Sequence, residues 1–178
     1  FLSIINYAKM NGLECYVSTN FSLADREILD KLISLKLAEI AVSVWAATEE
    51  TYCLVHNNKN AVTFRAIKDN LAYLNMKKNS HPKVKICNVI TKLNFFELEE
   101  MFEFAIETKS DIVEFTVIDI IPDKTEHLLL NSHERECAIK SCENIRKKLL
   151  VKNKKMKISN FDLFIRRISN PDSEYGIY

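Results

Sequence analysis

Short apolar or β-prone runs recur along the chain, and longer amphipathic stretches separate them. The runs lie at residues 14–19, 39–45, 83–90, 112–118 and 156–159. Runs of about four to eight residues are typical of strands rather than helices. The apolar character of residues 39–45 favours burial on both faces, as in a parallel sheet. We therefore predict four strands and a shorter fifth one.

Each interval between these runs contains a helical pattern. Helices are expected before Gly12 and at residues 22–33, 48–56, 61–77, 95–108, 132–150 and 160–168. Apolar residues at helical spacing supply their buried stripes. Ser22, with Asp25 three residues later, is expected to cap the second helix, and Ser132 is expected to cap the helix at 132–150.

Strands that alternate with helices form βαβ units, whose crossovers are almost always right-handed. We therefore predict an α/β fold, a parallel (β/α) segment of a partial TIM barrel with four to five strands and intervening helices. Residues 1–178 show no internal boundary and are expected to form one domain. Phe1 reads as the middle of a helix, and residues 173–178 lack a terminal cap, so we expect the central part of a barrel truncated at both ends.

Composition narrows the classes of partner. Apolar residues make up 47% of the chain and charged residues 28%, and the formal net charge is +1. This balance gives no reason to expect a nucleic-acid or anionic-membrane partner. No apolar run approaches the roughly 20 residues that a membrane-spanning helix needs.

Cysteine and glycine usage narrows the chemistry further. The five cysteines are odd in number and scattered, which argues against a disulfide framework and favours reduced thiols in the cytoplasm. Only two glycines occur, so a glycine-rich phosphate loop is excluded.

Ligands of parallel α/β folds bind at the carboxyl ends of the strands. That rule selects four segments in this chain, at residues 19–20, 43–46, 88–91 and 116–119. These segments are the candidate site before any family is considered.

Four stretches, in order, resemble the radical S-adenosylmethionine (SAM) superfamily. Residues 16–20 are similar to its strand ending in Thr-Asn-Gly, and residues 39–46 to its strand whose serine reaches the SAM ribose. Residues 82–90, followed by Asn94 and Leu98, resemble its fifth strand, and residues 111–118 its sixth. The match covers residues 1–150, and residues 160–167 are similar to text that leads into a cysteine-rich, SPASM-like C-terminal extension.

This resemblance implies a specific chemistry. In the superfamily, SAM bound to a [4Fe–4S] cluster is cleaved reductively to a 5′-deoxyadenosyl radical, which takes hydrogen from a substrate. An electron donor such as ferredoxin or flavodoxin is implied as a partner, and the substrate stays unknown. The cofactors carry the hard chemistry, while the protein binds, orients and excludes water.

The chain departs from the superfamily at several points. Its Cys-x3-Cys-x2-Cys loop and its Gly-Gly-Glu stretch are both absent from these residues, so no metal ligand is assigned here. Phe21 stands where the resemblance implies a glycine, and Ala46-Ala47 stands in place of Asp-Gly. Without the cluster loop, we expect this piece alone to be inactive.

The resemblance and the strand ends together give candidate cofactor-binding residues. Ser43 is the leading candidate for the SAM ribose, and Asn88 is expected to join it in the barrel lumen beside Ile86 and Ile90. The remaining candidates are Thr19, Asn20, Glu114 and Thr116. Each has a structural interpretation as well: a strand-end hydroxyl, a buried amide, a turn residue, or a carboxylate paired with a lysine.

Two other functions stay open at this stage. A cluster-free, degenerate barrel would act as a binding or structural module. A Schiff-base, aldolase-like lyase would need a lysine at a strand end, and Lys92 follows the third predicted strand.

Overall fold

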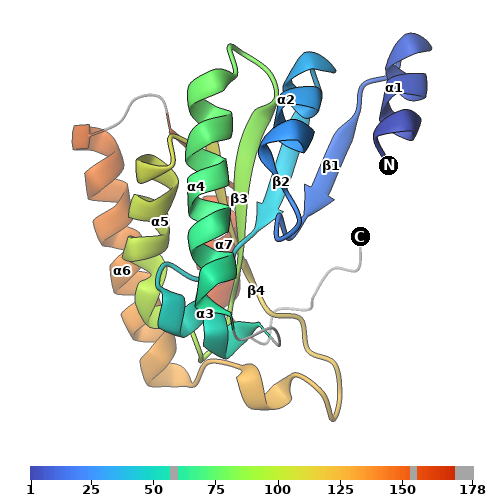
Figure 1. The fold of residues 1–178 in the computed structure, drawn as a ribbon. Helices are drawn as coiled ribbons and strands as arrows, with labels where there is room; N and C mark the ends of the chain where they lie inside the picture. The colour runs from blue at the N-terminus through green and yellow to red at the C-terminus, as the bar shows by residue number, and fades with distance from the viewer. Residues whose placement is uncertain (57–59, 153–155, 171–178) are drawn as a thin grey trace.

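The computed structural model describes residues 1–56, 60–152 and 156–170 and contains one parallel sheet (Figure 1). The strands are β1 (Tyr16–Thr19), β2 (Glu39–Ser43), β3 (Lys83–Ile90), β4 (Ile112–Val117) and β5 (Lys157–Ser159). They lie in the order β1-β2-β3-β4-β5, and every neighbouring pair is parallel. The predicted α/β fold is confirmed, and it is consistent with part of a β/α barrel.

Helices connect successive strands. They are α1 (Leu2–Met10), α2 (Arg26–Ser34), α3 (Glu49–Val55), α4 (Ala61–Lys77), α5 (Leu98–Glu107), α6 (Ser132–Lys152) and α7 (Phe161–Ser169). Two short 3-10 turns, η1 (Phe95–Glu97) and η2 (Glu126–Leu128), lie after β3 and β4. Sequential strand order with right-handed crossovers places the connecting helices on one side of the sheet.

The two faces of the sheet therefore differ. The helix-covered face carries fully buried side chains such as Ile40, Val42, Ile86 and Phe115. We call the opposite face the inner face. Its side chains, fixed by the strand register, are Tyr16, Ser18, Glu39, Ala41, Ser43, Lys83, Lys85, Cys87, Val89, Ile112, Glu114, Thr116, Lys157 and Ser159.

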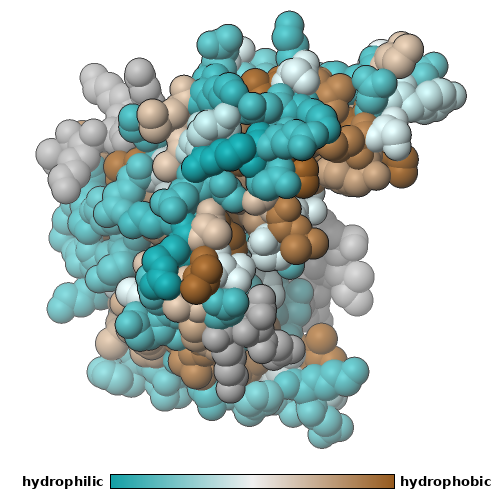
Figure 2. Space-filling model, viewed as in Figure 1, coloured by the Kyte–Doolittle hydropathy of each residue, from teal (hydrophilic) through white to brown (hydrophobic). Residues whose placement is uncertain are grey.

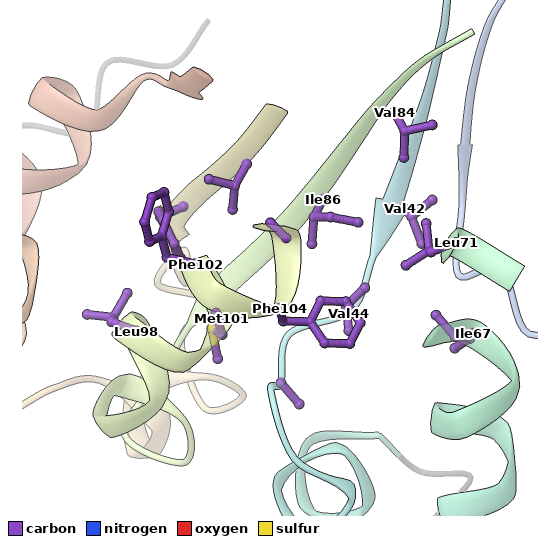
Figure 3. Close-up of a cluster of buried hydrophobic side chains, with 14 of the residues drawn as sticks. Val42, Val44, Ile67, Leu71, Val84, Ile86, Leu98, Met101, Phe102 and Phe104 are labelled. Atoms are coloured by element: carbon purple, nitrogen blue, oxygen red, sulfur yellow. The ribbon is translucent and has the colours of Figure 1, made fainter. Parts of the chain in front are cut away.

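The core lies between the sheet and the helices, as Figure 3 shows. Side chains of β2, β3, α4 and α5 meet there, among them Val42, Val84, Ile67, Leu71 and Phe102. Burying one such aliphatic or aromatic side chain stabilises a fold by about 1.5–3 kcal/mol. This packing is what holds the strand ends, and the loops that follow them, in place.

Two predicted helix caps are wrong. Asp25, not Ser22, is the N-cap of α2, because its carboxylate accepts the Ile28 N–H at 2.8 Å. At α6, Asn131 precedes the predicted cap: its Oδ1 accepts the Glu134 N–H at 2.9 Å, and the Glu134 carboxylate accepts the Asn131 N–H at 2.7 Å. This reciprocal pair is a capping box, so Ser132 is already the first helical residue.

Candidate functional site

Because all five strands are parallel, their carboxyl ends lie along one edge of the sheet. In Figure 1, β1, β2 and β3 run downward toward this edge. At the end of β1, Thr19 Oγ1 accepts the Phe21 N–H at 2.9 Å, and Asn20 Oδ1 accepts the Ser22 N–H at 3.2 Å. These bonds close a turn in which Phe21 has φ 60°, a left-handed conformation that favours glycine. The resemblance implies a glycine at this position.

Ser43 and Asn88 lie on opposite faces of the sheet. Ser43 is in register with Cys87 on β3, so the next residue along, Asn88, points the other way. Asn88 does share its face with Ile86 and Ile90, but that face is the one that the helices cover. The predicted shared cavity for these two side chains is therefore wrong.

Glu114 and Thr116 lie on the inner face with Ser43. Lys85 Nζ reaches the Glu39 carboxylate at 3.1 Å and the Glu114 carboxylate at 3.4 Å, and Ser159 Oγ donates to Glu114 at 2.8 Å. Four neighbouring strands are thus linked by one polar cluster. The interpretation of Glu114 as a lysine-paired carboxylate is confirmed.

Burial and the charges of this cluster together shift the pKa values of Lys85 and Cys87. Burial acts to lower the pKa of the Lys85 ammonium, but the hydrogen bond to Glu39 and the charges of both carboxylates outweigh it and raise that pKa. Burial, aided by the charge of Glu114, raises the pKa of the Cys87 thiol to about 11. Around neutral pH the inner face therefore presents a lysine cation and a protonated thiol.

The loop of residues 44–48, which follows β2, is the best anchored part of the edge. Asn88 Oδ1 accepts the Trp45 N–H at 3.1 Å, and Asn94 Nδ2 donates to the Trp45 carbonyl at 2.8 Å. Asn94 Nδ2 also donates to the Val89 carbonyl at 2.9 Å. The N–H and the carbonyl of Trp45 are thus bound by Asn88 of β3 and by Asn94 of the loop that follows β3.

Glu97 binds the rest of the same loop. Its carboxylate accepts the Ala47 N–H at 2.8 Å, the Thr48 hydroxyl at 2.6 Å and the Thr51 hydroxyl at 2.7 Å. The residue is only 5% exposed. A buried carboxylate is stable only with such partners, so this arrangement fixes the loop and the first turn of α3 together.

His56 holds the loop from the other end of α3. Its Nε2 lies 2.9 Å from the Val44 carbonyl oxygen, and because a carbonyl only accepts, Nε2 carries the hydrogen. The imidazole lies between Tyr52, at 4.3 Å between ring centroids, and Trp45, at 5.5 Å.

Asn94 and Glu97 were missed as site residues, although a signal for them exists. Four residues recur at helical spacing: the polar Asn94 and Glu97 and the apolar Leu98 and Met101. All four are buried in the structure. Polar residues on the buried stripe of a helix start must find partners, so the pattern alone indicates a polar network there. For Lys85 and Cys87 the sequence pattern shows only that they lie at alternate positions of one strand and therefore share a face.

The part of the chain that the structure describes contains no group of three His, Cys, Asp or Glu side chains that could hold a metal ion. Cys137 is exposed and Cys142 is buried in the helix layer, so this pair points apart, as predicted. The described cysteines therefore do not fit a [4Fe–4S] cluster. Among the same residues, no helix is long and apolar enough to cross a bilayer.

Lys92 does not resemble a Schiff-base lysine. Its side chain is exposed, and its backbone N–H donates to the Leu128 carbonyl at 2.9 Å. A Schiff-base lysine is activated by desolvation or by a neighbouring cation, so the structure does not favour the lyase.

The fold class is thus a one-sided, parallel α/β sheet, which is consistent with part of a β/α barrel, a fold whose ligands bind at the carboxyl edge of the strands. No family model matches the chain, and no curated protein matches its sequence. Solved structures do match it.

The fold is similar to that of SuiB from Streptococcus suis, with a TM-score of 0.70 and 13% identity. SuiB bound to S-adenosylmethionine matches with a TM-score of 0.64 and 13% identity, and SuiB bound to the precursor peptide SuiA matches with 0.60 and 14%. Each alignment covers 89% of this chain but only 34–35% of the SuiB chain. The chain thus spans about a third of the length of these neighbours.

Proposed function

We propose that this chain is part of the barrel of a radical SAM enzyme, and that its carboxyl edge holds the nucleoside half of SAM. The observation that carries the proposal is the similarity of the fold, over 89% of the chain, to SuiB bound to S-adenosylmethionine. The ordered sequence resemblance to the radical SAM superfamily supports the same assignment.

Ser43 and Thr116 are the side chains that we assign to the nucleoside. Both lie on the inner face, Ser43 at the last residue of β2 and Thr116 next to the last residue of β4. A hydroxyl both donates and accepts, which suits a ribose diol or an adenine ring. Glu114 is engaged by Lys85 and Ser159, so we assign it to the wall of the site rather than to direct contact.

Thr19, Asn20 and Asn88 act indirectly in this proposal. The first two close the turn after β1, and Asn88 accepts the Trp45 N–H from the helix-covered side. We assign them the shaping of the loops that surround the nucleoside.

We assign the [4Fe–4S] cluster to residues outside those described, because the described cysteines do not fit it. Bound together, the cluster and SAM would supply the 5′-deoxyadenosyl radical. The residues described here bind the nucleoside, orient it and exclude water from it.

Equilibrium dialysis of the 178-residue chain against radiolabelled SAM tests this assignment. Adenosine should compete with SAM and methionine should not, because the chain is assigned only the nucleoside half. Ser43→Ala should weaken retention about five- to tenfold, the effect of losing one hydrogen bond of about 1–1.5 kcal/mol.

Ser34→Ala is the matched control, because Ser34 lies on α2 and its hydroxyl donates to the Lys31 carbonyl of the same helix. It should bind SAM like the unaltered chain. Failure of adenosine to compete, or equal retention by Ser43→Ala and Ser34→Ala, would contradict the proposal and favour a cluster-free module.

A further inference from the structure

The loop of residues 44–48 is held by side chains distant in sequence. Asn88, Asn94 and Glu97 reach it across separations of 43, 49 and 50 residues. All three are almost fully buried, with exposed fractions of 2%, 0% and 5%. Hydrogen bonds shielded from water in this way are not exchanged for solvent, so they keep the loop in one conformation.

Trp45 shows why the loop needs this support. Its φ is 60°, in the left-handed region that costs a residue with a side chain about 1–2 kcal/mol. Its N–H and its carbonyl are both bound by asparagine side chains, and its ring lies against His56. The surrounding contacts over-determine a conformation that the residue would not adopt alone.

The same loop adjoins the site proposed above. Val44, the first loop residue, follows Ser43 directly, and its N–H donates to the Cys87 carbonyl at 3.1 Å. The direction in which the Ser43 hydroxyl points at the strand end thus depends on a backbone that continues into the anchored loop. A loose loop would leave both Ser43 and the Trp45 ring without a fixed place.

We propose that Asn94 and Glu97 are positioning residues, which hold the 44–48 loop ready for the nucleoside. This inference rests on the proposed function, since the benefit of a fixed loop is a ligand that binds beside it. Pre-ordering a loop lowers the entropy that binding would otherwise cost, so the anchors act on ligand affinity without touching the ligand.

The chain carries its own reporter of this loop. Trp45 is its single tryptophan, so fluorescence excited at the red edge of the indole band, where the six tyrosines do not absorb, reports on this loop. Glu97→Ala removes all three acceptor contacts to Ala47, Thr48 and Thr51. We expect a red-shifted Trp45 emission, at least a twofold rise in acrylamide quenching, and about a tenfold loss of adenosine affinity, the effect of a 1.4 kcal/mol ordering cost.

Conservative and milder variants separate positioning from general loss of structure. In Glu97→Gln the amide oxygen can still accept the Ala47 N–H, and the amide NH2 group can donate to the Thr48 and Thr51 hydroxyl oxygens. This variant should therefore have nearly the adenosine affinity and the low acrylamide quenching of the unaltered chain. Thr51→Val removes one donor at nearly constant volume and should give an intermediate loss, even if Glu97→Ala does not fold.

Glu99→Ala is the matched control on the same segment. The Glu99 carboxylate binds Asn144 and Lys148 of α6 rather than the loop. It should lower the melting temperature without changing Trp45 quenching or adenosine affinity. If Glu97 had a merely structural role, Glu97→Ala and Glu99→Ala would have the same effects on melting temperature, Trp45 quenching and adenosine affinity.

The outcomes distinguish the two proposals. If the unaltered chain binds no adenosine, the proposed function fails, while Trp45 quenching still decides whether Glu97 fixes the loop. If Glu97→Ala and Thr51→Val leave the quenching unchanged, the loop is not held by these contacts and the inference is wrong. If quenching rises while adenosine affinity stays constant, the anchors are structural only.

Discussion

At the scale of single residues, the thiols of Cys142 and Cys87 lie in surroundings that keep them protonated. Burial raises the pKa of Cys142 to about 12 and that of Cys87 to about 11. Cys137 on the same helix as Cys142 is exposed. A buried, protonated thiol resists alkylation and metal binding, because the thiolate is the reactive form.

The raised pKa of the Cys142 thiol predicts how the free energy of unfolding changes with pH. A thiol in the unfolded chain loses its proton near pH 8.5, whereas Cys142 in the folded chain keeps it, so the unfolded state binds fewer protons and stability falls as the pH rises. Urea unfolding at pH 8 and pH 10 should show the fall. In Cys142→Ala the fall should be smaller by about 1–2 kcal/mol.

Cys137→Ala is the control for this measurement, because its thiol is exposed. It should keep the pH dependence of the unaltered chain. The prediction is wrong if both alanine variants lose the same stability between the two pH values.

At the scale of elements, caps and packing decide where the helices begin. Ser22 is the predicted cap of the second helix, but Asp25 also has a side-chain oxygen that can accept a helix N–H. The structure uses Asp25, while the Ser22 hydroxyl donates to Asn20 Oδ1 at 2.9 Å. Ser22 therefore belongs to the turn after β1, and α2 begins only at Arg26.

Substitution of each residue separates the two assignments. Asp25→Ala should lower the free energy of unfolding by about 1 kcal/mol, because the Ile28 N–H loses its acceptor. Ser22→Ala should change it by less than about 0.5 kcal/mol, as is usual for exposed positions. Chemical unfolding followed by far-UV circular dichroism measures both, and a larger effect at Ser22 would restore the original assignment.

At the scale of the whole molecule, apolar side chains remain exposed at the β1 end of the sheet. Figure 1 shows α1 beyond β1, and Figure 2 shows hydrophobic side chains gathered there. The exposed large apolar residues in this region are Phe1, Ile4, Tyr7, Met10, Leu13, Tyr16 and Leu23. In the part of the chain that the structure describes, β1 pairs with β2 alone, and an apolar surface beside such a strand edge promotes association.

A lysine on this surface should reduce self-association. Ile4 is 72% exposed, so Ile4→Lys should lower light scattering of the concentrated chain severalfold while leaving the unfolding free energy within about 0.5 kcal/mol. Asn6→Lys adds the same charge at a polar position of α1 and should have a smaller effect. Equal scattering from the two variants would show that charge, rather than the apolar surface, controls solubility.

Local sequence pattern was sufficient for the type and order of the elements and for the class of fold, but not for every boundary. Strand and helix periods are set by neighbouring residues, so the runs at 83–90 and 61–77 correspond to β3 and α4 residue for residue. Alternating strands and helices then leave a parallel sheet with right-handed crossovers as the arrangement to expect. The radical SAM resemblance similarly rests on ordered local motifs.

The composition of the site was decided only by tertiary structure. Alternation shows which residues of one strand share a face, but the parity between strands is set by register, and the Ser43–Cys87 pairing sends Asn88 to the helix-covered side. The contacts of Glu97 with Ala47 and of Lys85 with Glu114 likewise join segments that no local pattern connects. Sequence alone thus determined the order of the strands and their approximate bounds, although β2 ends at Ser43 rather than at the predicted Trp45. Packing determined which side chains meet at the strand ends.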